Sequence, residues 1–91
     1  LRRRCADARE MLAQSLKRLQ RAGLLRGMDG TERDLAARLC EAVPQLRPEQ
    51  AEKLQADALR SAFGGAGALP ADPEIYTQCR KAAASRRRKR R

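Results

Sequence analysis

The sequence predicts an all-α protein, a small bundle of three to four helices with a basic N-terminal end and a polybasic C-terminal tail. Apolar residues recur three and four positions apart, as they do on one face of a helix. Glycine and proline separate these periodic segments, and no segment alternates between apolar and polar residues as a strand does. The expected layout is a single helical domain over 1–85, followed by a polybasic tail over 86–91.

The first helix is expected at about 5–25. Residues at helical spacing form its apolar face, namely Ala8, Leu12, Leu16 and Leu19. Its opposite face carries basic residues, so the helix is amphipathic. The glycines Gly27 and Gly30 end the periodic segment because glycine is a poor helix former.

The second helix is expected at about 31–43. Thr31 and Asp34 have the spacing of a capping pair at a helix start. The expected buried stripe consists of Leu35, Leu39, Val43 and Leu46. Pro44 stops or bends the helix because proline lacks the backbone N–H that a helix needs.

The third helix is expected at about 48–63. Pro48 suits a first-turn position, and the glycines that follow residue 63 end the helix. Its apolar set is Ala51, Leu54, Ala58, Leu59, Ala62 and Phe63. Because Phe63 belongs to this stripe, we expect it in the core rather than on a surface that stacks bases.

The fourth helix is expected at about 73–85, after a connector of small residues over 64–71. Asp72, Pro73 and Glu74 supply the cap, the first-turn proline and the N-terminal acid of a helix start. Its apolar side consists of Ile75, Tyr76, Cys79, Ala82 and Ala83. Cations complement the dipole at a helix C-terminus, so the helix can extend some way into the basic run.

The charge is separated along the chain. The 91 residues carry a net charge of +10, and histidine is absent. Residues 1–28 contribute +6, residues 76–91 contribute +8, and the middle, 29–75, contributes −4. A mildly acidic helical body therefore lies between two basic ends.

Several function classes have no support in the sequence, and we expect a protein that is not an enzyme. The cysteines Cys5, Cys40 and Cys79 form no CxxC pair, so neither a metal site nor a catalytic thiol is predicted. No cofactor and no small-molecule substrate are expected. No apolar stretch approaches the length of a membrane span, so we expect no membrane partner.

The candidate nucleic-acid-binding residues lie in the two basic ends. They are Arg2, Arg3, Arg4, Arg80, Lys81, Arg86, Arg87, Arg88, Lys89, Arg90 and Arg91. Arginine forks match phosphate oxygens in a bidentate manner, which suits contact with an RNA or DNA backbone. Readout of bases is not expected, because only two aromatic residues are present. A nuclear-import signal, or a solvated or acid-binding tail, are the other interpretations of this run.

The function expected from this pattern is that of a structural component of a ribonucleoprotein, such as an organellar ribosome. The basic ends would lie along the RNA (or DNA) phosphate backbone while the acidic helical body contacts neighbouring proteins. We expect an intracellular protein, with mitochondrion or plastid favoured. A first residue of Leu1 rather than Met is what removal of a transit peptide leaves, although an excised fragment would show it too.

Two resemblances support an alternative. The segments REMLAQSL at 9–16 and DLAARLCEAV at 34–43 resemble helices of the central domain of transcript-cleavage elongation factors. The segments AEKLQADALRSAF at 51–63 and EIYTQCRK at 74–81 resemble the last two helices of KIX domains, which bind activation peptides. Each resemblance covers half of the chain or less, and the closing Asn-Leu-Lys signature of the elongation-factor domain is absent. Both imply a helical protein-interaction module of the transcription machinery, nuclear through its basic tail.

Overall fold

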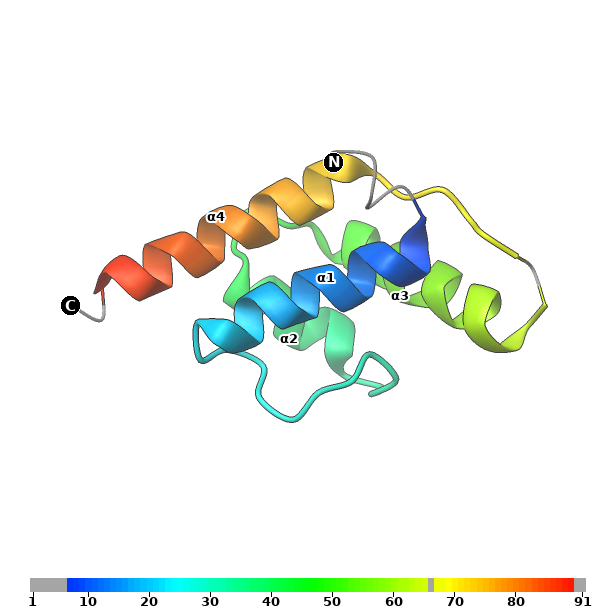
Figure 1. Ribbon diagram of the computed structural model, residues 1–91, viewed down its shortest axis with the longest axis horizontal. Coiled ribbons are helices and arrows are strands. Elements are labelled where there is room, and N and C mark those ends of the chain that lie inside the picture. The colour runs from blue at the N-terminus through cyan, green and yellow to red at the C-terminus, as the bar shows by residue number, and fades with distance from the viewer. Residues whose placement is uncertain (1–6, 66, 90–91) are drawn as a thin grey trace.

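Four helices make up the fold (Figure 1). The structure, a computed structural model, describes residues 7–65 and 67–89. Helix α1 spans Ala8–Arg21, α2 Leu35–Ala42, α3 Pro48–Phe63 and α4 Pro73–Lys89. The described residues form no strand, which confirms the prediction of an all-α fold with three to four helices.

Helix α1 is shorter than the helix expected at about 5–25. The Oδ1 atom of Asp7 caps its start by accepting a hydrogen bond from the Glu10 backbone N–H at 2.8 Å. Residues 5 and 6 lie outside the described range. The expected last turn is wrong, because Gly23 (φ 89°) and Leu25 (φ 51°) adopt left-handed conformations that end the helix after Arg21.

Helix α2 begins later than the predicted residue 31. The predicted capping pair is wrong: the Thr31 hydroxyl donates to Asp29 Oδ1 at 2.7 Å, and Asp34 makes no side-chain capping bond. Because the turn at 29–31 uses these polar groups internally, the helix starts only at Leu35. It ends at residue 42, and Pro44 follows its cap as expected.

Helix α3 has the predicted bounds. Pro48 occupies its first position, and the Arg47 backbone N–H donates to Gln50 Oε1 at 3.0 Å. The prediction that Phe63 lies in the core is wrong, because its side chain is 78% exposed. Phe63 follows the buried Leu54 by nine residues, which is two and a half helical turns, so it lies on the opposite face.

Helix α4 extends past the predicted end at residue 85 and continues to Lys89. Of the predicted apolar side, Ile75, Cys79 and Ala83 are buried, whereas Tyr76 and Ala82 are only partly buried. The described side chains after Ala83 are exposed. The last turns of α4 are therefore held by helical backbone bonds and by cations that complement the helix dipole.

The core lies where α1 meets both α3 and α4, while α2 packs on α3. Leucines from the first three helices supply most of its bulk, as the apolar spacing predicted. Those with less than a tenth of their surface exposed are Leu12, Leu16, Leu19, Leu35, Leu39 and Leu54, and Leu46 in the turn between α2 and α3 is equally buried. Helix α4 contributes Ile75, Cys79 and Ala83 to the core, and it packs against α1.

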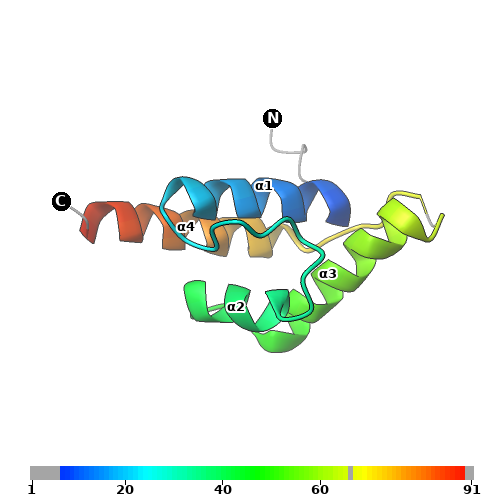
Figure 2. The same cartoon turned by 90° about the horizontal axis from the view of Figure 1, so that it is seen from below.

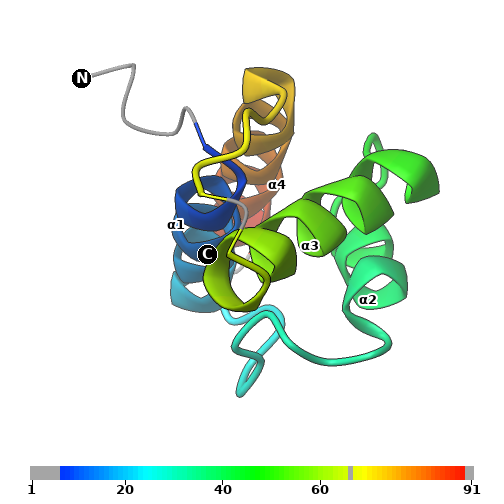
Figure 3. The same cartoon turned by 90° about the vertical axis from the view of Figure 1, so that its right-hand side faces the viewer.

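Helices α1 and α4 lie side by side and run in the same direction (Figures 1 and 2). The connector after α3 returns the chain to the start of α1, where the Ala8 N–H donates to the Leu69 carbonyl at 2.7 Å. Further along, Ser15 of α1 contacts Cys79 of α4. Figure 3 shows α2 and α3 to one side of this pair. The fold thus has an α1–α4 layer and an α2–α3 layer.

Candidate nucleic-acid interface

The two layers differ in charge. Helices α1 and α4 together hold ten Lys and Arg residues and only two acids, Glu10 and Glu74, which is a net charge of +8. Helices α2 and α3 hold three basic and four acidic residues, a net charge of −1. The charge separation along the chain therefore becomes a separation between layers, with the basic charge on the α1–α4 layer.

The described basic side chains of the α1–α4 layer form no ion pairs with nearby acids. The ion pairs found in the described part of the chain join Asp34 to Arg38, and Asp57 to both Lys53 and Arg60. None of them involves α1 or α4. The α1–α4 layer thus presents positive charge that an external anion can neutralise.

One arginine of this layer is held in place by the neighbouring helix. The Nε atom of Arg18 on α1 donates to the Tyr76 hydroxyl on α4 at 3.1 Å. The Arg18 guanidinium carbon also lies 6.0 Å from the centre of the Tyr76 ring, within reach of a cation–π contact. Both residues are half-buried. Tyr76 therefore orients the guanidinium before any ligand arrives, which lowers the entropy cost of binding.

Helical spacing places two further arginines beside this contact. Arg21 follows Arg18 by three residues on α1, and Arg80 follows Tyr76 by four residues on α4. Residues three and four apart are neighbours on a helix surface, and both of these arginines are exposed. We call Arg18, Arg21 and Arg80 the seam arginines, because they flank the line where α1 meets α4.

The structure describes some of the predicted site residues and not others. Arg80, Lys81 and Arg86 are exposed on α4, and the backbone of residues 87–89 continues the same helix. The helix thus continues through residues 86–89 of the predicted tail, as the expected extension into the basic run allowed. Residues 2–4, 90 and 91 lie outside the described range.

Sequence reasoning missed the contribution of α1 to this interface. The basic face that the sequence predicts for the first helix includes Lys17, Arg18 and Arg21, but helical periodicity alone does not indicate that this face lies beside α4. The signal that could have found the pairing was indirect. Tyr76 is an amphipathic aromatic residue in the otherwise small-residue stripe of α4, and such a residue needs a polar neighbour for its hydroxyl.

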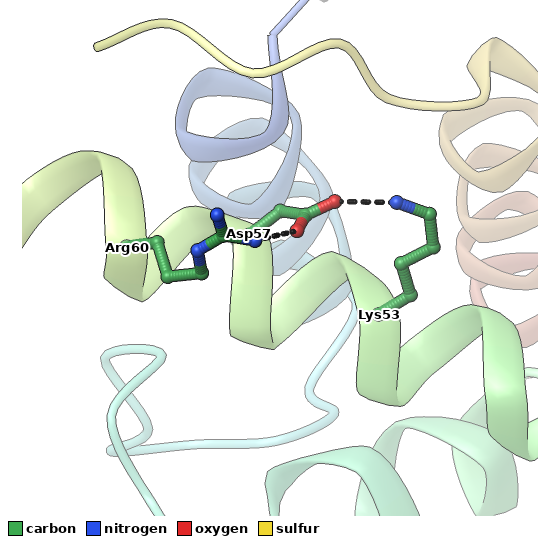
Figure 4. A network of polar contacts seen from close by, with 3 residues as sticks. All are labelled: Lys53, Asp57 and Arg60. Carbon is green, nitrogen blue, oxygen red and sulfur yellow. Dashed lines mark hydrogen bonds and ion pairs between the residues drawn. The ribbon is translucent and has the colours of Figure 1, made fainter. Parts of the chain in front are cut away.

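A second charged cluster lies on α3 (Figure 4). The Asp57 side chain, only 12% exposed, accepts a hydrogen bond from Lys53 Nζ at 2.8 Å and lies 3.7 Å from an Arg60 nitrogen. All three residues come from one helix, at the i, i+4 and i, i+3 spacings. The cations compensate a carboxylate that burial would otherwise penalise, so this cluster stabilises α3.

The two cysteines of the described part are protonated thiols. Burial raises the pKa of Cys79 to about 11, and contact with Ser15 offsets part of that effect. Burial also raises the pKa of Cys40, and the nearby charges of Glu52 and Glu49 add to it. A raised pKa opposes the thiolate form that nucleophilic or metal-binding chemistry requires. Cys5 lies outside the described range.

Comparisons with protein-family models, with curated proteins and with solved structures give no match to this chain. None of the helices in the part that the structure describes combines the length and the apolar character that a membrane crossing requires.

Proposed function

We propose that this chain is a non-enzymatic protein that docks on the phosphate backbone of RNA as a structural component of a ribonucleoprotein, such as an organellar ribosome. The observation that carries the proposal is the α1–α4 layer, with a net charge of +8 and no internal ion pair among its described side chains. RNA phosphates would supply the missing counter-charges and release condensed cations. The α2–α3 layer, which is close to neutral, would face neighbouring proteins.

The orientation of Arg18 supports phosphate binding over a merely solvated surface. A guanidinium that already donates to a tyrosine hydroxyl through Nε still has its two terminal nitrogens, which can engage two phosphate oxygens together. Arg21 and Arg80 lie one helical turn from this contact, so consecutive phosphates of one strand could bridge the three seam arginines.

The test compares two triple variants of equal net charge. One removes the seam arginines (Arg18→Gln, Arg21→Gln, Arg80→Gln), and the matched control removes Arg33, Arg38 and Arg47 in and around α2. Fluorescence anisotropy with a labelled RNA is recorded between 50 and 200 mM salt. The plot of log affinity against log salt should become shallower by about 2 to 3 units of slope for the seam variant. The control variant should keep the wild-type slope. Equal losses in both variants would show that only net charge matters.

A second candidate is a helical interaction module of the transcription machinery with a nuclear-targeting tail. The exposed Phe63 at the end of α3 favours it, because an aromatic residue that is 78% exposed can anchor a protein contact. A fluorescent fusion of the full chain distinguishes the two candidates. Nuclear accumulation that depends on residues 86–91 would favour this one, whereas co-sedimentation with a ribonucleoprotein would favour RNA docking.

A further inference from the structure

Ser85 is an exposed serine on α4, two residues after Ala83, and the side chains described beyond Ala83 are all exposed. It lies between the basic pair at residues 80 and 81 and the basic run at 86–91, and no acid occurs from residue 76 to the end of the chain. We propose that Ser85 is a phosphorylation site for a protein kinase with an acid-lined substrate cleft, and that phosphorylation weakens the RNA contact of α4. The second half of this inference depends on the proposed function.

Access and local charge together distinguish Ser85 from the other serines and threonines of the described chain. Ser61 is partly buried, and the exposed Thr31 donates its hydroxyl to Asp29, in an acidic turn. Ser15 is fully buried, and the Thr77 hydroxyl donates to the Pro73 carbonyl within α4. Kinases bind their substrates as extended segments, so the modified residue must lie where the helix can unwind. Ala84, Ser85 and Arg86 are all exposed, and unwinding this end therefore removes no described side chain from the core. The flanking cations complement an acidic cleft.

ATP donates the phosphoryl group that is transferred to Ser85. The Ser85 hydroxyl oxygen forms a bond to the γ-phosphorus while the bond from that phosphorus to the β,γ-bridging oxygen breaks. The hydroxyl proton passes to the kinase base, and ADP leaves.

The phosphate acts on the basic helix in two ways. It introduces a charge of about −1.5 to −2 at pH 7, against six basic residues on α4. Lys81 lies one helical turn before Ser85 on α4 and is exposed, so its ammonium group becomes an internal counter-ion of the phosphate. A negative charge near the C-terminus of a helix also opposes the helix dipole and destabilises its last turn. The first effect reduces the positive charge available to RNA, and the second disturbs the helix that presents this charge.

The first experiment tests the site itself. The full chain is incubated with ATP and a kinase catalytic domain that prefers basic substrates, and the phosphate is located by tandem mass spectrometry. We expect one phosphate, on Ser85, and none on the Ser85→Ala variant. Modification at Ser61 or Thr77 instead, or no modification while a basic control peptide is phosphorylated, would overturn the assignment.

The second experiment tests the switch. Protein carrying phosphoserine at position 85, unmodified protein and Ser85→Ala are titrated with the same RNA at 100 mM salt. The phosphorylated chain should bind roughly 10- to 100-fold more weakly, and its slope of log affinity against log salt should be shallower by about 2. The Ser85→Ala variant should match the unmodified chain. Equal binding by the phosphorylated and unmodified chains would overturn the switch. If the unmodified chain binds no RNA, the proposed function and the switch both fail, whereas phosphate mapping still decides the site.

Discussion

At the scale of single residues, the contact between α1 and α4 is formed in part by small polar side chains. Cys79 and Ser15 are both fully buried there. The Ser15 hydroxyl has no partner with full hydrogen-bond geometry among the described residues, so its influence on the thiol is weak and burial dominates the pKa of Cys79. Burial favours the neutral thiol, so folding and deprotonation of Cys79 oppose each other.

Alkaline pH should therefore destabilise the protein through Cys79. Its pKa rises from 9.0 to about 11 on folding, so the unfolded chain loses this proton first as the pH rises. The stabilisation is complete below pH 9 and is lost as the pH approaches 11, by roughly 3 kcal/mol in all. Urea unfolding at pH 7.5, 9, 10 and 11 measures this loss. The Cys79→Ala variant, in which other groups still titrate, should show a correspondingly smaller fall; identical pH profiles would contradict the burial of the thiol.

The contact between Arg18 and Tyr76 has its own prediction. Tyr76→Phe keeps the ring but removes the hydroxyl that accepts from Arg18 Nε. The free energy of unfolding should change by at most about 1.5 kcal/mol, because the hydroxyl that accepts the lost hydrogen bond is neutral and the contact is only partly buried. Affinity for RNA should fall about 2- to 10-fold, because Arg18 is no longer oriented before binding. The two quantities are measured by urea unfolding and by anisotropy. Unchanged affinity with normal folding would show that the orientation of Arg18 does not matter.

At the scale of the elements, α1 is the helix on which the others depend, since it packs against both α3 and α4. Helix α2 reaches the rest of the fold mainly through α3. The apolar stripes are made of leucine and alanine, with Phe63 outside the core. A small core of this kind contributes little net stability, so shortening one leucine removes a large share of it.

Shortening a core leucine should destabilise the fold strongly. Leu12→Ala, Leu39→Ala and Leu54→Ala remove side chains that are at most 6% exposed, and each should cost roughly 2 to 5 kcal/mol. Leu59 on α3 is only half-buried, so Leu59→Ala is a matched control with a smaller loss. Thermal unfolding of the four variants measures the difference. Wild-type unfolding of the three core variants would mean that the helix faces are assigned wrongly.

Most of the helices could be predicted from the sequence, and the errors have local physical causes. The bounds of α3 followed from Pro48 and from the glycines after Phe63. The start of α2 could not be predicted, because Thr31 bonds to Asp29 rather than to the helix. Apolar character alone predicts that Phe63 is buried. Its angular position, half a turn away from the buried Leu54, instead places it on the exposed face of α3. The seam arginines depend on the side-by-side packing of α1 and α4, a tertiary fact that helical periodicity does not contain.

At the scale of the whole molecule, the residues that pack in the core and the residues that carry positive charge occupy different parts of α4. The first turns supply Ile75, Cys79 and Ala83 to the core, and the last turns supply cations. Because no described side chain after Ala83 is buried, the stability of the bundle and its affinity for polyanions should be separable.

Removing residues 86–91 should test that separation. Truncation after Ser85 deletes no side chain that the structure describes as buried, so the free energy of unfolding should change by at most about 1 kcal/mol, through the lost dipole contact and relieved repulsion. Helical signal should fall only by the few residues of α4 that are removed. Affinity for RNA should fall at least about 100-fold at 100 mM salt, since six cations are lost. Circular dichroism and an RNA titration at fixed salt measure both. If the truncated chain binds RNA as tightly as the full chain, the basic run is not a contact surface.

The parallel course of α1 and α4 also determines how much nucleic acid one molecule can cover. Both helices run in the same direction, and the end of α4 lies beyond the end of α1 (Figure 2). Helix α4 has 17 residues, so at about 1.5 Å per residue it is about 25 Å long. With phosphates about 3.4 Å apart along each strand of a duplex, α4 alone would span roughly seven base pairs. Nuclease footprints should therefore be at least that long, and neighbouring molecules that bind this way must be spaced by at least that length.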